Sequence, residues 1–208
     1  MAESKRLSAR IIQRPLFVTI LLIMVLSISA CRTTAGTDHD QIVKASIDLA
    51  DSYIGLARYE EALGVYDRAL EQTNDYRLYY NKAIVLSCLD RNLEAAQLCS
   101  ESFEQFPHIL ALKKAEAYYF RLAGDSASSF NAYLQVLELN PYDRETRMRF
   151  IDNLIEDGQN QTAYEQALLM WNQGYRDAES IGYLYRLQPG AWKNVYELIG
   201  TESQIKEQ

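Results

Sequence analysis

The side chains of this sequence best suited to chemistry are three cysteines and two histidines. Cysteine and histidine are the usual zinc ligands, and in other patterns they serve as nucleophile and base. His39 and His108 share no metal-ligand spacing with a cysteine or with each other. The chain contains neither a G-x-S-x-G sequence nor a glycine-rich phosphate loop. The sequence therefore predicts no metal, no cofactor and no catalytic residue, and we expect a protein that is not an enzyme.

Cys31 differs from the other two cysteines because of what precedes it. Residues 1–14 carry four basic side chains against the single acidic Glu3, and residues 15–30 carry no charge. A basic start, a short apolar stretch and small residues before a cleavage point are typical of a secretory signal. The uncharged stretch is 16 residues long, shorter than the roughly 20 of a spanning helix. This favours a cleaved signal, with an uncleaved N-terminal anchor as the alternative.

The residues Ile28-Ser29-Ala30-Cys31 resemble a bacterial lipobox, whose cysteine becomes the first residue of the mature protein and carries lipid on its sulfur. The resemblance implies a signal peptide over 1–30, lipidation at Cys31 and a membrane anchor, which two or more acyl chains make stable. Residues 31–40 have no apolar pattern and are predicted to be a tether. In the sorting rule of enteric-type bacteria, Arg32 after the cysteine favours the outer membrane, with the protein facing the periplasm.

The charge of the chain excludes one class of partner. The whole sequence carries −7, and the segment before Cys31, with four positive charges and one negative, carries +3. The remainder therefore carries −10, which makes it a poor partner for nucleic acid or for an anionic membrane surface. We expect no nucleic-acid binding. An acidic, aromatic-rich surface allows self-association without requiring it, so the oligomeric state stays open.

The chain after the tether is periodic. Three sets of residues recur in phase, at intervals of 33 or 34 positions: Ala50, Ala83, Ala117 and Ile151; Ala62, Ala95, Ser129 and Ala163; and Tyr66, Cys99, Tyr133 and Ala167. Most are small side chains, which let two helix backbones approach closely, or aromatic side chains that fill the holes beside them. Pro107 and Pro141 end two of the copies, because proline disfavours helical geometry in the residue before it.

The segment 49–70 closely resembles a tetratricopeptide repeat, a unit of about 34 residues that folds as two antiparallel helices. The matching residues are Leu49, Ala50 and Tyr53 in the first helix and Ala62, Tyr66 and Ala69 in the second. The resemblance implies an all-α fold, a right-handed superhelix of about four repeats over residues 41–174.

Beyond Gly174 the repeat phase is lost. Helices are expected over 177–187 and 191–199, separated by Gln188-Pro189-Gly190. The last repeat of an array needs a cap, so residues 175–208 are interpreted as a capping helix pair and tail. The alternative is a partner-docking surface built from Trp192 and Tyr196.

Cys88 and Cys99 fall on the two helices of one predicted hairpin, about one helical turn out of register. A disulfide needs Cα atoms within roughly 7 Å. Two small apolar core residues are favoured, and a disulfide is the alternative.

The first helices of tetratricopeptide arrays line a concave groove that takes peptides from partner proteins. The groove positions expected here are Arg77, Tyr80, Lys114, Tyr118, Arg121 and Arg149. The cations could pair carboxylates and the tyrosines supply rigid contact area; the alternative is a solvated surface of ordinary charge pairs. The carboxylate clamp of chaperone adaptors is not matched, since only Asn81 or Arg149 lands on one of its positions.

These resemblances imply a membrane-anchored scaffold or adaptor of the bacterial cell envelope, of the assembly-factor, pilotin or transporter-associated type. An envelope protein or peptide would bind in the groove. The alternative is a ligand-handling partner of a solute transporter, which predicts a closed apolar cavity lined by residues such as Tyr118, Tyr119, Phe120 and Phe150.

Overall fold

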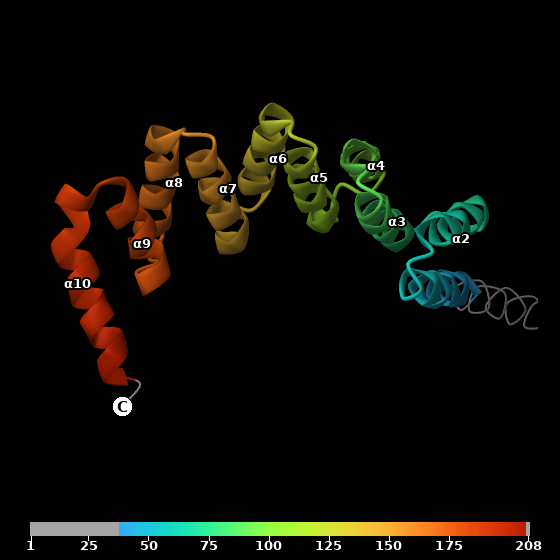
Figure 1. Cartoon of the computed structure of the whole chain (residues 1–208), viewed down its shortest axis with the longest axis horizontal. Coiled ribbons are helices and arrows are strands. Elements are labelled where there is room, and N and C mark those ends of the chain that lie inside the picture. The colour runs from blue at the N-terminus through green and yellow to red at the C-terminus, as the bar shows by residue number, and fades with distance from the viewer. Residues whose placement is uncertain (1–37, 207–208) are drawn as a thin grey trace, which may run out of the picture. The chain divides into compact units, whose positions relative to one another are not determined.

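The computed structural model describes residues 38–206 (Figure 1), and every regular element in this range is an α-helix. This confirms the all-α class. The predicted signal peptide, the lipidation site Cys31 and residues 31–37 of the tether lie outside the described residues. None of the described helices is both long and apolar enough to cross a membrane.

The chain forms two compact units, one ending at Leu78 and the other beginning at Tyr79. The first contains a helix over residues 38–54 and α2 (Tyr59–Gln72). α3 (Tyr76–Cys88) contains the division. The second unit continues with α4 (Asn92–Gln105), α5 (Leu110–Leu122), α6 (Ser126–Leu139), α7 (Arg144–Glu156), α8 (Asn160–Asn172), α9 (Ala178–Leu187) and α10 (Pro189–Lys206). From α4 onward each helix packs on the next one along the chain.

The predicted tether is wrong at its C-terminal end. The first helix already includes residues 38–40, which the sequence assigned to the tether. The reason is tertiary, because His39 and Asp40 bond to the side chains of Asp75 and Arg77, far along the chain, as described below.

The residues that recur every 33 or 34 positions are the ones buried between helices. Each of the twelve residues in the three sets is 3% exposed or less. In the first three helix pairs, a small residue on the first helix thus shares the interior with a small residue on the second, and in the fourth pair Ile151 takes the first-helix position. Close backbone approach at these points is what the repeat pattern specifies.

Ser129 is the one polar residue among the twelve, and the structure shows how it is accommodated. It is 2% exposed, and its hydroxyl donates to the carbonyl oxygen of Ala117 at 2.8 Å. Ala117 occupies the first-helix position of the same pair, so the hydroxyl bridges two helices where they come closest. A buried hydroxyl with a partner carries little penalty.

The turns between paired helices also repeat. Ala57, Asp90, Gly124 and Gly158 each have positive φ, at +55°, +60°, +79° and +72°. Their numbers show that each lies one repeat period after the one before it. Ala57 and Asp90 take the same left-handed conformation with a side chain present, which is strained for alanine and tolerated by aspartate.

The prediction that the repeat phase is lost after Gly174 is wrong at the start of α9. Asp143 caps α7 by accepting from the amide of Thr146 at 3.1 Å. Asp177, one repeat period later, caps α9 by accepting from the amide of Ser180 at 2.9 Å. α9 is therefore the first helix of a fifth, shortened pair. α10 begins at Pro189, where a proline is suited to the first helical turn because that N–H has no helical partner.

Trp192 of α10 packs inward rather than offering a docking surface. Its ring lies edge-on to Trp171, with centroids 5.2 Å apart, and its indole N–H donates to the hydroxyl of Tyr164 at 3.1 Å. Tyr196 stacks on Tyr185 with centroids 4.6 Å apart. These contacts support the capping interpretation of the last pair.

Both described cysteines are free thiols. Cys88 is exposed and Cys99 is fully buried. Burial, with a smaller effect of the nearby Glu116 charge, raises the pKa of the Cys99 thiol to about 12. A protonated, buried thiol behaves as a small apolar core residue.

The turn geometry gives a matched pair of glycine substitutions. An added Cβ would meet nothing within 4 Å at either Gly158 or Gly182, but only Gly158 has positive φ. We expect Gly158→Ala to lower the free energy of unfolding by about 1 kcal/mol. Gly182→Ala, inside α9, should raise it by about 0.5–1 kcal/mol. Urea unfolding followed by circular dichroism measures both, and effects of the same sign would contradict the turn assignment.

Candidate functional site

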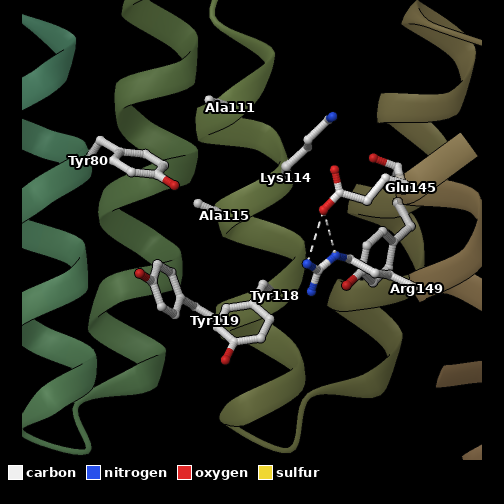
Figure 2. Close-up of a pocket in the computed structure, with 10 residues that line it drawn as sticks. Tyr80, Ala111, Lys114, Ala115, Tyr118, Tyr119, Glu145 and Arg149 are labelled. Atoms are coloured by element: carbon white, nitrogen blue, oxygen red, sulfur yellow. Dashed lines mark hydrogen bonds and ion pairs between the residues drawn. The ribbon is translucent and has the colours of Figure 1, made fainter. Parts of the chain in front are cut away.

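A pocket in the second unit lies on α3, α5 and α7 (Figure 2). Its volume is about 420 Å³. The lining residues are Tyr80, Ala111, Lys114, Ala115, Tyr118, Tyr119, Tyr133, Glu145, Thr146 and Arg149. All but Tyr133 come from first helices of successive pairs, so the pocket lies on the face where the sequence predicted a groove.

Helical spacing explains why these side chains meet. On α5, Ala111, Lys114, Ala115 and Tyr118 follow one another at intervals of three, one and three positions, which places them on one helix face. Glu145 and Arg149 are likewise one turn apart on α7. Leu112 and Ala117, which lie off this face of α5, are fully buried and hold the helix in the core.

The pocket has a small-residue floor between an aromatic side and a charged side. In Figure 2, Ala111 and Ala115 lie between Tyr80 and Lys114. Tyr80 is 36% exposed and Tyr118 is 45% exposed, so part of each ring is open to a partner. Exposed aromatic area beside methyl groups is the kind of surface that binds a partner's side chain.

Lys114 pairs with Asp143, and this pair is part of the fold. The Asp143 side chain is only 9% exposed and also caps α7. Burial alone would raise the pKa of Asp143, but the hydrogen bonds from Lys114 and from the Thr146 amide outweigh it and lower that pKa. Removing the charge of Lys114 would leave the nearly buried capping carboxylate of Asp143 without its counter-ion.

Arg149 pairs with Glu145 in a different setting. Nε and Nη2 of Arg149 lie 3.3 Å and 3.0 Å from Oε1 of Glu145. The two side chains are 57% and 73% exposed. An exposed pair one helical turn apart contributes only about 0.3–0.5 kcal/mol. This ion pair can therefore open at little cost.

Of the six predicted groove residues, the structure brings Tyr80, Lys114, Tyr118 and Arg149 together in the pocket, and Arg121 lies elsewhere. Arg121 donates to Asp157 at 2.6 Å, to Glu156 at 2.7 Å and to Ser126 at 2.9 Å. The hydrogen bond to Asp157, with that to Glu156, raises the pKa of Arg121. Its guanidinium thus ties α5 to the end of α7.

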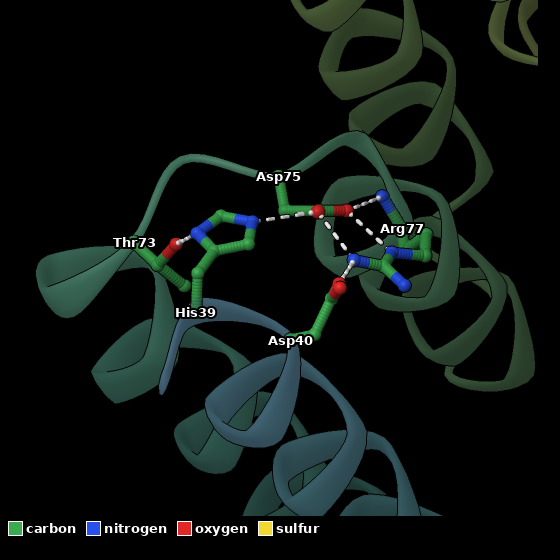
Figure 3. A network of polar contacts seen from close by, with 5 residues as sticks. All are labelled: His39, Asp40, Thr73, Asp75 and Arg77. Carbon is green, nitrogen blue, oxygen red and sulfur yellow. Dashed lines mark hydrogen bonds and ion pairs between the residues drawn. The ribbon is translucent and has the colours of Figure 1, made fainter. Parts of the chain in front are cut away.

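Arg77 belongs to the first unit and to a polar network around Asp75 (Figure 3). Asp75 accepts from the backbone amide, Nε and Nη2 of Arg77 at 2.8, 2.9 and 2.8 Å. The second carboxylate in contact with Arg77 is Asp40, at 2.7 Å. His39 Nε2 lies 3.0 Å from Asp75, and its Nδ1 lies 2.5 Å from the hydroxyl of Thr73.

This network ties the helix over 38–54 to the connection between α2 and α3. Thr73, His39 and Asp75 stand in the order hydroxyl, imidazole, carboxylate, which is also the order of a hydrolytic triad. Here both oxygens of Asp75 accept from Arg77, so the carboxylate charge is already balanced by a guanidinium. The arrangement is suited to holding the helices together. Sequence reasoning missed it, because His39 and Asp75 lie far apart in the chain and form no motif.

No family model and no curated protein matches this sequence. Solved structures do match its fold. A tetratricopeptide repeat protein from Parabacteroides merdae is 13% identical with a TM-score of 0.62, covering 79% of this chain and 68% of that one. MamA from Desulfovibrio magneticus is 13% identical with a TM-score of 0.56, covering 80% and 94%. YrrB, described as a TPR protein with an unusual peptide-binding site, is 21% identical with a TM-score of 0.52, covering 73% and 78%. This chain therefore has the tetratricopeptide-repeat fold.

Asp75 makes the stability of the first unit pH-dependent. We expect Asp75→Asn to lower the free energy of unfolding at pH 7 by about 1–3 kcal/mol, because Arg77 loses its nearly buried counter-charge. Hydrogen bonds from Arg77 hold the pKa of Asp75 well below its usual value. A carboxylate with a lowered folded pKa stabilises fully above about pH 4 and progressively less below it.

The difference between wild type and Asp75→Asn should therefore shrink as the pH falls below about 4, as measured by urea unfolding with circular dichroism. Asp48→Asn, an exposed carboxylate on the helix over 38–54, is the control and should change stability by less than about 0.5 kcal/mol. A difference for Asp75→Asn that stays constant with pH would contradict the assignment.

The two cations of the pocket should respond differently to neutralisation. Lys114→Gln is expected to lower the free energy of unfolding by about 1–2 kcal/mol, because the nearly buried Asp143 still caps α7 but loses its positively charged partner. Arg149→Gln should change it by less than about 0.5 kcal/mol. Thermal and urea unfolding of the two variants side by side provide the measurement, and equal effects would disprove the distinction between a structural and an exchangeable pair.

Proposed function

We propose that this protein is a lipid-anchored scaffold of the bacterial cell envelope that binds a segment of another envelope protein on α3, α5 and α7. The observation that carries the proposal is the pocket with two exposed tyrosines and an alanine floor, on the first helices of successive pairs. YrrB, which has the same fold, is described as having a peptide-binding site. That description supports a peptide as the kind of ligand to test first.

The pocket favours a peptide over an enclosed small molecule. Tyr118 is 45% exposed, so the site opens to solvent. A ligand-handling protein was expected to enclose an apolar cavity lined by Tyr118, Tyr119, Phe120 and Phe150. Phe150 instead packs in the core against Phe130 and Tyr133, with ring centroids 4.9 and 5.7 Å away. It does not line this pocket, and neither does Phe120.

The anchor is proposed from the sequence. The lipobox-like residues before Cys31 motivate lipidation and a place at the outer membrane facing the periplasm. Seven residue steps separate Cys31 from the first described helical residue, a reach of at most about 25 Å. A lipid on Cys31 would therefore keep the first helix pair close to the membrane surface. Assembly of outer-membrane proteins, secretin piloting and transporter adaptation are all compatible with such a scaffold.

The test is crosslinking in intact cells, followed by capture of the full-length protein from solubilised membranes and mass spectrometry. We expect one stoichiometric envelope protein, reduced at least about five-fold in a Tyr80→Ala, Tyr118→Ala double variant because rigid aromatic anchors dominate such contacts. Exposed tyrosines are better targets than Arg77, Lys114 or Arg121, whose ion pairs hold the fold. Tyr142→Ala, which removes a 68% exposed tyrosine outside the pocket, is the matched control.

Cys31→Ala in the same cells tests the anchor separately. The variant should leave the membrane fraction and lack the mass of a lipid, because the sulfur that carries it is gone. Capture of this chain alone would count against the scaffold. An unchanged membrane fraction for Cys31→Ala would count against lipidation.

A further inference from the structure

Glu145 occupies an unusual position for an acidic side chain in a pocket predicted to be basic. Its carboxylate lies beside the guanidinium of Arg149 and faces the same space as Lys114 in Figure 2. The Glu145 side chain is 73% exposed. Unlike Asp143, it caps no helix and lies outside the core, so rotation about its own torsions would uncover Arg149 without disturbing the fold.

The net charge of the accessible side chains at the pocket becomes more positive when Glu145 turns away. Asp143 is nearly buried and occupied by Lys114 and the Thr146 amide. The exposed charged side chains are therefore two cations, Lys114 and Arg149, and one carboxylate, Glu145. With Glu145 turned away, two cations face the opening of the pocket, in a chain whose remainder after the predicted signal carries −10. A carboxylate from outside would complement this site, whereas a cation would meet two like charges.

The uncharged part of the pocket indicates which side chain the partner carries next to that carboxylate. Ala111 and Ala115 are one helical turn apart, about 6 Å along α5, and Tyr80 borders them on the side away from Lys114. This leaves a methyl-lined floor next to exposed rings. A flat aromatic side chain would cover both methyl groups and contact a tyrosine edge. The volume of about 420 Å³ suits one or two side chains of a peptide.

We infer that Glu145 is an internal stand-in for a carboxylate of the partner. The partner segment is an acidic peptide in which an aromatic residue is adjacent to aspartate or glutamate. The aromatic ring lies on Ala111 and Ala115, and the acidic side chain replaces Glu145 on Arg149 near Lys114. This inference rests on the proposed function and specifies the chemistry of its partner.

The experiment uses the full-length protein in detergent micelles and a fluorescein-labelled, blocked peptide, Gly-Ser-Trp-Glu-Ser-Gly, whose binding is followed by fluorescence anisotropy. Three further peptides replace glutamate by glutamine, glutamate by lysine, or tryptophan by alanine. We expect each replacement to weaken binding to the wild-type protein, with lysine weakest. Equal binding of the glutamate and lysine peptides would overturn the inference.

Protein variants test the role of Glu145 directly. Glu145→Gln should tighten binding of the glutamate peptide about 2–5-fold, because it removes both a competing ion pair and a like charge. Arg149→Gln should weaken it at least about five-fold. Glu197→Gln is the matched control, since Glu197 forms the same kind of exposed pair with Lys193 on α10, outside the pocket. It should leave binding unchanged.

A matched pair of variants tests the alanine floor. Ala111→Leu would fill the floor and should weaken binding at least about five-fold through steric exclusion. Ala127→Leu adds the same side chain to an exposed position of α6 outside the pocket and should have no effect.

Unchanged or weaker binding by Glu145→Gln would disprove the stand-in role. If the capture experiment succeeds but Glu145→Gln does not tighten binding, the proposed scaffold function is retained and only the acidic partner is rejected.

Discussion

The structure depends on the close approach of antiparallel helices at small side chains. At Ala50 and Ala62 in the first unit, and at Ala117 and Ser129 in the second, the exposed fraction is 2% or less. A larger side chain at such a point would separate the backbones and shift every contact further along the pair. Because each pair packs mainly on its neighbours, the same constraint returns once in every repeat, which is why the period is visible in the sequence.

Charge has two roles in this molecule. Ion pairs such as Lys114 with Asp143 and Arg121 with Asp157 join segments and restrict how helices meet. The pair of Arg149 with Glu145 joins nothing beyond one helical turn. The distinction is one of burial and geometry, since a nearly buried partner makes a pair costly to break while solvent makes an exposed one nearly neutral. Only the second kind can open at little cost and release its charge to a ligand.

The pocket is a consequence of the repeat rather than an addition to it. First helices face one side because their other face is buried, so their outward residues gather wherever neighbouring pairs meet. Small residues at Ala111 and Ala115 then leave space instead of filling it, and Tyr80 and Tyr118 border that space. Binding specificity in such a fold can change by substitution of the exposed lining residues while the buried positions stay the same.

The sequence by itself determined the all-α class, the repeat and its buried positions, because packing constraints that recur at a fixed spacing leave a periodic record. It also identified the helix face that carries Tyr80, Lys114, Tyr118 and Arg149. Tertiary structure alone decided that Arg77 and Arg121 are occupied by carboxylates, that His39 belongs to a network with Asp75, and that α9 keeps the repeat register. These features depend on pairs of residues far apart in the chain, whose side-chain directions no local pattern encodes.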